Sequence, residues 1–234
     1  DLGISINDIR IDLFNNFLDN KFFNIFFIFL CFSILLNGTN FIDGNNGLSI
    51  GYFLIISFII FKLIEDQKII YEIKILVPLI LILFVLLFFN LLNKLYIGDN
   101  GVYILVIFYG YILINIYYKN PTISPYFIVN LLWYPAFETL FSILRKLKYD
   151  YSPMSPDTRH LHHLIFNIYT KKMRLSNKLA NSFTGLSINI YNLLILFYAS
   201  MHVRETKIQV LCIFLSVIAY IFLYYFLKKK KLFK

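Results

Sequence analysis

The fold is decided by residues 73–92, whose sequence is IKILVPLILILFVLLFFNLL. An α-helix rises about 1.5 Å per residue, so a run of this length covers the hydrocarbon core of a bilayer, which is roughly 30 Å thick. Six further runs of similar character lie at 22–40, 47–64, 101–118, 123–144, 179–200 and 208–227. The ten-residue alternating pattern of a membrane β-barrel does not recur. We therefore predict an all-α polytopic transmembrane helical bundle with about seven spans.

The composition also indicates a membrane protein. Of the 234 residues, 59% are hydrophobic and 15% are charged, whereas about 25% is usual in soluble domains. The net charge of +9 does not indicate nucleic-acid binding, because basic residues flank the apolar runs and fill the tail Lys228–Lys231. Such residues act as topology signals beside anionic lipid. Asn, Ile, Lys, Phe and Tyr are abundant, as AT-rich codon usage produces, so a single Asn carries little weight.

With seven crossings, alternate connections share one side of the membrane. The segments after the first, third, fifth and seventh runs carry 14 of the 22 Lys and Arg residues, which makes their side cytoplasmic by the positive-inside rule. These segments are 37–47, 93–101, 145–178 and the tail from residue 228. We predict one membrane-embedded domain over 1–234, with a cytoplasmic, histidine-containing loop at 145–178.

Two motif-like stretches on that side contain acids beside glycines. The first, NGTNFIDGNNGL at 37–48, places Asn40 and Asp43 three residues apart and so on one helix face. By itself, DGNNG is also an ordinary tight turn. The second, YIGDNG at 96–101, places Asp99 at the start of a helix. Asp99 could hold a hard divalent cation together with phosphate oxygens, or it could cap the helix.

The third stretch, SPMSPDTRHLHH at 152–163, gathers Arg159, His160, His162 and His163. These side chains can neutralise phosphate oxygens or assist proton transfer. A zinc site is the competing interpretation, but Cys31 and Cys212 lie in distant apolar runs and no fourth ligand is evident. An unstructured basic loop is the remaining alternative.

Glu138 is a further polar residue, because it lies inside the fifth apolar run, seven residues before Arg145. A carboxylate within a span normally faces the bundle interior and has a partner there. It could support the site, or it could form a hydrogen bond with a neighbouring helix where Pro135 leaves backbone groups free.

Together these groups favour metal-assisted phosphoryl transfer. Acids would hold the cation, and the cation and basic side chains would spread the charge of the transferring phosphate. A transporter or channel subunit is the alternative, although it should bury polar residues near the middle of its spans. A structural membrane protein with three solvated turns is the third possibility.

At these residues the chain resembles the polyprenyl-phosphate N-acetylhexosamine-1-phosphate transferases of glycosyltransferase family 4, relatives of phospho-N-acetylmuramoyl-pentapeptide transferase. The stretch 37–48 is similar to the family's Asn-x-x-Asn-x-x-Asp-Gly-x-x-Gly-Leu motif, 98–101 to its Gly-Asp-x-Gly, and 152–163 to its histidine loop. Residues 135–145 resemble the span that leads into that loop.

The resemblance implies that a lipid-linked phosphate attacks a UDP-amino-sugar and releases UMP, with Mg²⁺ or Mn²⁺ bound by Asp99. Undecaprenyl phosphate would be the acceptor, at the cytoplasmic face of a bacterial inner membrane, in O-antigen, lipopolysaccharide or cell-wall synthesis. The expected partners are these substrates and the bilayer, with a homodimer left open. The implied catalytic residues are Asp43, Asp99, His160, His162 and His163, and the implied substrate-binding residues are Asn40, Gly44, Asn46, Tyr96 and Arg159.

One departure from the family is the lack of its adjacent aspartate pair. No Asp-Asp occurs in the sequence, and four preceding spans would be expected. We therefore expect this chain to be amino-terminally incomplete and, alone, to be inactive.

Overall fold

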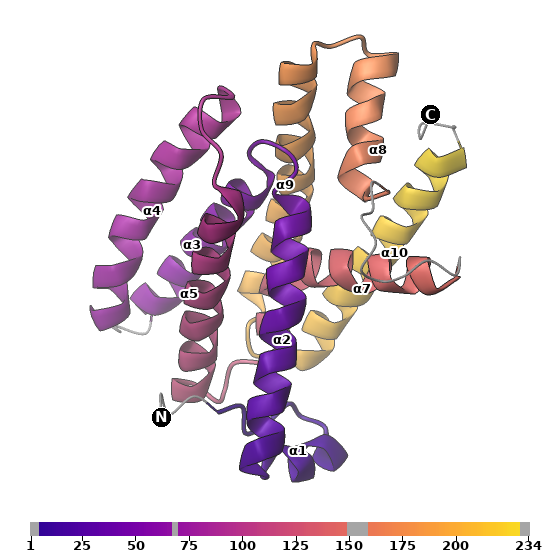
Figure 1. Ribbon diagram of the computed structural model, residues 1–234. Coiled ribbons are helices and arrows are strands. Elements are labelled where there is room, and N and C mark those ends of the chain that lie inside the picture. The colour runs from indigo at the N-terminus through magenta and orange to yellow at the C-terminus, as the bar shows by residue number, and fades with distance from the viewer. Residues whose placement is uncertain (1–4, 67–69, 149–158, 230–234) are drawn as a thin grey trace.

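The computed structural model describes residues 5–66, 70–148 and 159–229. All regular elements within these ranges are helical, so the predicted all-α bundle is confirmed (Figure 1). The helices are α1 (Asp12–Leu18), α2 (Lys21–Ile42), α3 (Leu48–Asp66), α4 (Ile70–Leu91), α5 (Gly98–Lys119), α6 (Pro125–Leu131), α7 (Trp133–Lys148), α8 (Leu161–Asn167), the π-helical turn η1 (Ile168–Lys172), α9 (Asn177–Met201) and α10 (Thr206–Lys229).

Each predicted apolar run coincides with a helix or a helix pair. Among the described residues, five helices are long and apolar enough to cross a membrane, namely α2, α4, α5, α9 and α10. The apolar part of α3, Leu48–Leu63, is shorter. The fifth run differs from the simple span that the sequence predicts, because α6 and α7 meet at an angle of 76°. In Figure 1, α7 lies crosswise to the long helices.

The break between α6 and α7 is stabilised by a tyrosine from another helix. Pro135 has no backbone N–H, so it cannot donate to the carbonyl of Leu131 one turn earlier. The Tyr52 hydroxyl of α3 donates to that carbonyl instead (3.0 Å) and accepts from the Tyr134 N–H (3.4 Å). The freed backbone groups are therefore satisfied inside the protein, as groups at membrane depth must be.

Helix α7 has its polar side turned inward. Glu138, Ser142 and Arg145 are buried, whereas Leu144 and Leu147 are about 60% exposed, at 64% and 57%. This is the reverse of an amphipathic helix in a water-soluble protein, and it suits a helix whose outer face meets lipid. The inward orientation expected for Glu138 is thus observed.

The long helices place the first two polar stretches, and the described part of the third, at one end of the bundle. In Figure 1 the α2–α3 and α4–α5 connections and α8 lie at the end where α10 finishes, opposite α1 and the α9–α10 turn. The predicted alternation of the connections therefore agrees with the fold.

Two close backbone approaches fix the helices around this end. A Cβ on Gly38 would lie 1.8 Å from the Pro135 carbonyl oxygen, so only glycine lets α2 meet the start of α7. A Cβ on Gly185 would lie 2.2 Å from the Asn46 carbonyl oxygen, so α9 packs directly on the α2–α3 connection.

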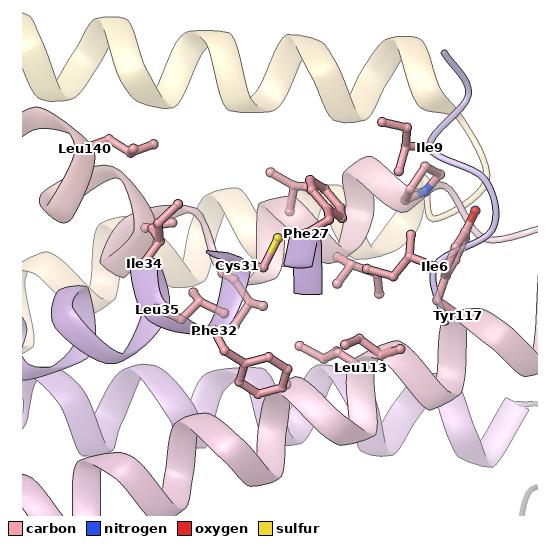
Figure 2. A pocket seen from close by; sticks show the side chains of 17 residues that line it. Ile6, Ile9, Phe27, Cys31, Phe32, Ile34, Leu35, Leu113, Tyr117 and Leu140 are labelled. Carbon is pink, nitrogen blue, oxygen red and sulfur yellow. The ribbon is translucent and has the colours of Figure 1, made fainter. Parts of the chain in front are cut away.

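An apolar pocket of about 250 Å³ lies between α2, α5 and the α6–α7 pair. Figure 2 shows Phe27, Cys31 and Leu35 of α2 facing Leu113 and Tyr117 of α5 across it. Its lining carries no charged side chain, which makes it unsuited to a nucleotide diphosphate.

Candidate active site

The α2–α3 connection, residues 43–47, is held by a group of asparagine side chains. Asn181 of α9 accepts hydrogen bonds from the Asn45 side-chain amide (2.6 Å) and the Asn46 N–H (3.2 Å). The Asn46 side chain donates to Asn93 after α4 (2.8 Å). The Gly47 N–H donates to Asn90 of α4 (2.5 Å), and its carbonyl accepts from Asn189 of α9 (2.7 Å). The loop is therefore fixed by amides from two other helices.

Asp43 follows the last residue of α2 and faces the start of α5. The Ser49 hydroxyl donates a hydrogen bond to its carboxylate. The pKa of Asp43 is raised to about 6, chiefly by burial and also by the Asp99 charge. The hydrogen bonds from Ser49 and from the Gly98 N–H act in the opposite direction. The hydrogen bond from Gly98 and the effect of the Asp99 charge on Asp43 indicate that the first and second motifs lie close together.

Asp99 itself lies in the first turn of α5 and is exposed. Gly98 before it has φ = +65°, a left-handed conformation that glycine adopts without strain and that turns the chain into the helix. The carboxylate of Asp99 is therefore presented to solvent beside the half-buried Asp43.

The histidines form a stack next to the same loop. The rings of His160 and His162 are nearly parallel, with their centroids 5.3 Å apart, and His163 lies 4.3 Å from His162. A Cβ on Gly44 would lie 3.4 Å from His162 Nε2, so the third motif contacts the first at Gly44. Phe41 of α2 packs against the His160 ring at 4.8 Å.

His162 is only 1% exposed. Burial lowers the pKa of His162 well below its ordinary value, and the charges of His163 and His160 lower it further. We therefore expect a neutral imidazole that offers a hydrogen bond, rather than a cation that neutralises phosphate.

The other predicted site residues lie at the surface of this region or within its scaffold. Asn40, Tyr96 and Arg159 are exposed, and His163 is half-buried. Asn46 is 3% exposed and its amide already bonds Asn93, so any contact with uridine would have to use its remaining atoms. Residues 152–158 of the third motif, including Asp157, lie outside the described part of the chain.

Sequence reasoning missed the residues that hold the site together. Ser49, Asn90, Asn181 and Asn189 all contact the 43–47 loop or Asp43, yet none belongs to a recognised motif. The available signal was Asn within apolar runs, and the abundance of Asn throughout the chain obscured it.

The donor set suits a hard divalent cation better than a closed zinc site. Within the described ranges, no three His, Cys, Asp or Glu side chains gather as metal ligands. Asp43 and Asp99 supply two neighbouring carboxylates, and Mg²⁺ is usually held by one or two carboxylates plus substrate phosphates and water. A cation here would also relieve the repulsion between the two acids.

Asp43→Asn is expected to stabilise the protein in the absence of divalent cations. The folded-state pKa of about 6 lies above the ordinary value of 3.8, so the stability that Asp43 contributes is full below about pH 4 and is lost as the pH rises through about 6. Thermal unfolding in detergent with chelator should show a higher Tm for the variant at pH 7.5 and a smaller gain at pH 5. The gain is at most about 3 kcal/mol, reduced by solvent screening.

Asp19→Asn is the matched control, because Asp19 is an exposed carboxylate beside α1. It should change the Tm little at either pH. An equal gain for Asp43→Asn at both pH values would show that ionisation of Asp43 is not the cause.

The fold and the site define a multi-pass membrane protein with a polar, acid-containing site at one end of its helices. A comparison with protein families agrees, since the model of the family described as Glycosyl transferase family 4 matches residues 2–117, about half of the chain. The chain belongs to this family of transferases, which confirms the resemblance given by the motifs. The matched half contains Asp43 and Asp99 and ends before Glu138 and the histidines. No curated protein and no solved structure matches the chain.

Proposed function

We propose that this protein transfers a sugar 1-phosphate, from a UDP-N-acetylhexosamine, to polyprenyl phosphate and releases UMP. The observation that carries the proposal is the meeting of Asp43, Asp99 and the Gly44–His162 contact at one end of a membrane-embedded bundle. Family membership supports a transferase that uses polyprenyl phosphate and a sugar nucleotide.

In the proposed reaction an oxygen of the acceptor phosphate forms a bond to the β-phosphorus of the UDP-sugar. The bond from that phosphorus to the bridging oxygen breaks, and UMP leaves with the electron pair. Bound Mg²⁺ or Mn²⁺ would neutralise the charge that develops on the phosphate oxygens. Asp99, with Asp43 beside it, would hold that cation.

The remaining residues would bind and orient the donor. Gly44 lets a phosphate approach the loop backbone beside the His162 ring. Arg159 and His163 would contact phosphate oxygens or the sugar, and the exposed ring of Tyr96, 67% accessible, would stack on uracil. Asn40 would lie near the diphosphate.

We place this reaction at the cytoplasmic face of a bacterial inner membrane, in the initiation of a surface polysaccharide such as O-antigen or a wall polymer. The distribution of Lys and Arg supports this orientation, because 14 of 22 lie in segments predicted for the side that carries the site.

The first test measures binding on the purified chain in detergent. Electron paramagnetic resonance of Mn²⁺ should show one tight site that forms only with UDP present, since phosphate oxygens complete the coordination shell. Mn²⁺ binding that is indifferent to UDP, or absent with it, would contradict the assignment of the site.

The second test measures transfer. Radiolabelled UDP-N-acetylhexosamine and polyprenyl phosphate are supplied to two samples. The first contains the chain alone, and in the second the chain is co-expressed with the Asp-Asp-containing spans of another family member. We expect a lipid-soluble, metal-dependent product in the co-expressed sample. A transporter, a channel subunit or a structural protein would make no such product.

A further inference from the structure

Glu138 is a fully buried carboxylate on the inner side of α7, with 0% of its side chain exposed. Its Oε1 accepts a hydrogen bond from the Tyr134 hydroxyl (3.3 Å), and its Oε2 lies 2.9 Å from His160 Nδ1. Buried carboxylates are costly unless they are bonded, and this one has a partner for each oxygen. Its partner on one side is a residue of the histidine stack.

The hydrogen bond determines which nitrogen of His160 carries the proton. An ionised carboxylate can only accept a hydrogen bond, so beside one Nδ1 is the donor, and Nε2 of a neutral imidazole is then an acceptor. The ring is also held from the side by Phe41, with centroids 4.8 Å apart. These two contacts hold the His160 ring in place from both sides.

This constraint extends to the loop that carries Asp43. The His160 ring is parallel to the His162 ring within 2°, and His162 contacts the loop at Gly44. His162 has a buried Nδ1 without a hydrogen-bond partner among the described residues, so packing rather than a hydrogen bond at that atom orients its ring. Removal of the support beneath His160 should loosen both rings.

Three further groups of the described residues, Arg145, Tyr220 and His163, lie near this pair. Arg145 lies further along the same helix. Its guanidinium carbon is 5.4 Å from the ring centroids of both Phe141 and Tyr224. The Tyr220 hydroxyl of α10 is near the Glu138 carboxylate, and His163 lies beyond His160 at 6.1 Å.

We propose that Glu138 is a positioning residue, which holds His160 as an Nδ1 donor and thereby orders the His160–His162 stack beside Gly44. Its consequence for catalysis rests on the proposed function, whereas the hydrogen bond and the tautomer do not. Metal-ligating histidines are commonly oriented by such a carboxylate, and its loss lowers metal affinity or activity about 10- to 100-fold. We expect a loss of activity of similar size here.

The direct test is nitrogen NMR of ¹⁵N-histidine-labelled protein in lipid bilayers. Four histidines are present, and the His160 signals are assigned by their loss in His160→Gln. Wild type should show His160 protonated at Nδ1, Glu138→Gln should retain that tautomer because the amide oxygen still accepts, and Glu138→Ala should show a mixture. Protonation at Nε2 in wild type, or an unchanged spectrum in Glu138→Ala, would overturn the proposal.

The kinetic test uses the transfer assay in the co-expressed sample. Glu138→Ala should lower kcat by about tenfold or more while KM for the UDP-sugar changes less than about threefold, and Glu138→Gln should recover much of the rate. Equal rates for all three proteins would show that the positioning has no role in the reaction. If wild type makes no product, the proposed function fails, and the NMR result still decides whether Glu138 positions His160.

Gln209→Ala is the control for general destabilisation. Gln209 is also fully buried and bonds Asn130 (2.7 Å) and the Ala199 and His202 carbonyls (both 2.8 Å), near the α9–α10 turn at the opposite end of the bundle. It should lower the Tm without altering the His160 tautomer. A tautomer change in this variant would mean that loss of stability alone disturbs the stack.

Discussion

Asp99→Asn is expected to remove nearly all transfer activity while the protein still inserts and folds. The substitution keeps the shape of the side chain and leaves a residue that is well tolerated at a helix start. It removes one of the two neighbouring acids, Asp43 and Asp99, so a bound cation would lose a charged ligand. Because Asp99 is exposed in the first turn of α5, no packing is lost.

The measurement is turnover in the transfer assay, together with UDP-dependent Mn²⁺ binding by the purified chain. Turnover should fall below about a tenth of wild type, a loss of more than about 1.4 kcal/mol in transition-state stabilisation. Mn²⁺ affinity should fall at least about tenfold. Asp19→Asn makes the same charge change at the other end and should leave both quantities unaltered. Wild-type Mn²⁺ binding by Asp99→Asn would remove the metal role of this residue.

Gly38→Ala is expected to be the most destabilising of the small substitutions. The added carbon would lie 1.8 Å from the Pro135 carbonyl oxygen, 2.5 Å from its carbon and 2.8 Å from Thr139 Oγ1. Two of these atoms are backbone and cannot rotate away, so α2 and α7 must separate. The Thr139 hydroxyl would also be drawn from the Ile34 carbonyl, to which it donates at 3.0 Å.

Such overpacking typically costs about 1–3 kcal/mol and sometimes more. Thermal unfolding in detergent should show a clearly lower Tm, and UDP-dependent Mn²⁺ binding should weaken because Asp43 directly follows α2. Ile25→Ala, at a 55% exposed position on the same helix, is the control and should change the Tm little. An unchanged Tm in Gly38→Ala would mean that the two helices do not pack this closely.

The sequence predicts the spans and the meeting of the motifs because both depend on local information. Apolar runs of membrane length become helices, and alternation of their ends brings Asp43, Asp99 and His162 to one end of the bundle. The helix break is different, since Pro135 indicates only a disturbance. The crosswise direction of α7 depends on Tyr52, more than 70 residues earlier, which satisfies the freed backbone groups.

The supporting contacts of the site could not be predicted for a similar reason. The bond from the Asn46 N–H to Asn181 joins residues 135 positions apart, and no periodicity marks either partner. Protonation states are equally hidden, because the low pKa of His162 arises from burial that only the packed structure provides. The motifs predict which residues carry the proposed chemistry, but not which of them are charged.

The asparagine scaffold around residues 43–47 has a consequence for how the site responds to its surroundings. Carboxamides do not titrate, and hydrogen bonds between neutral groups are scarcely screened by salt. A change in pH or ionic strength should therefore alter the charges of the acids and imidazoles of the site without deforming the 43–47 loop. The asparagine scaffold is therefore uncharged at every pH at which the site works.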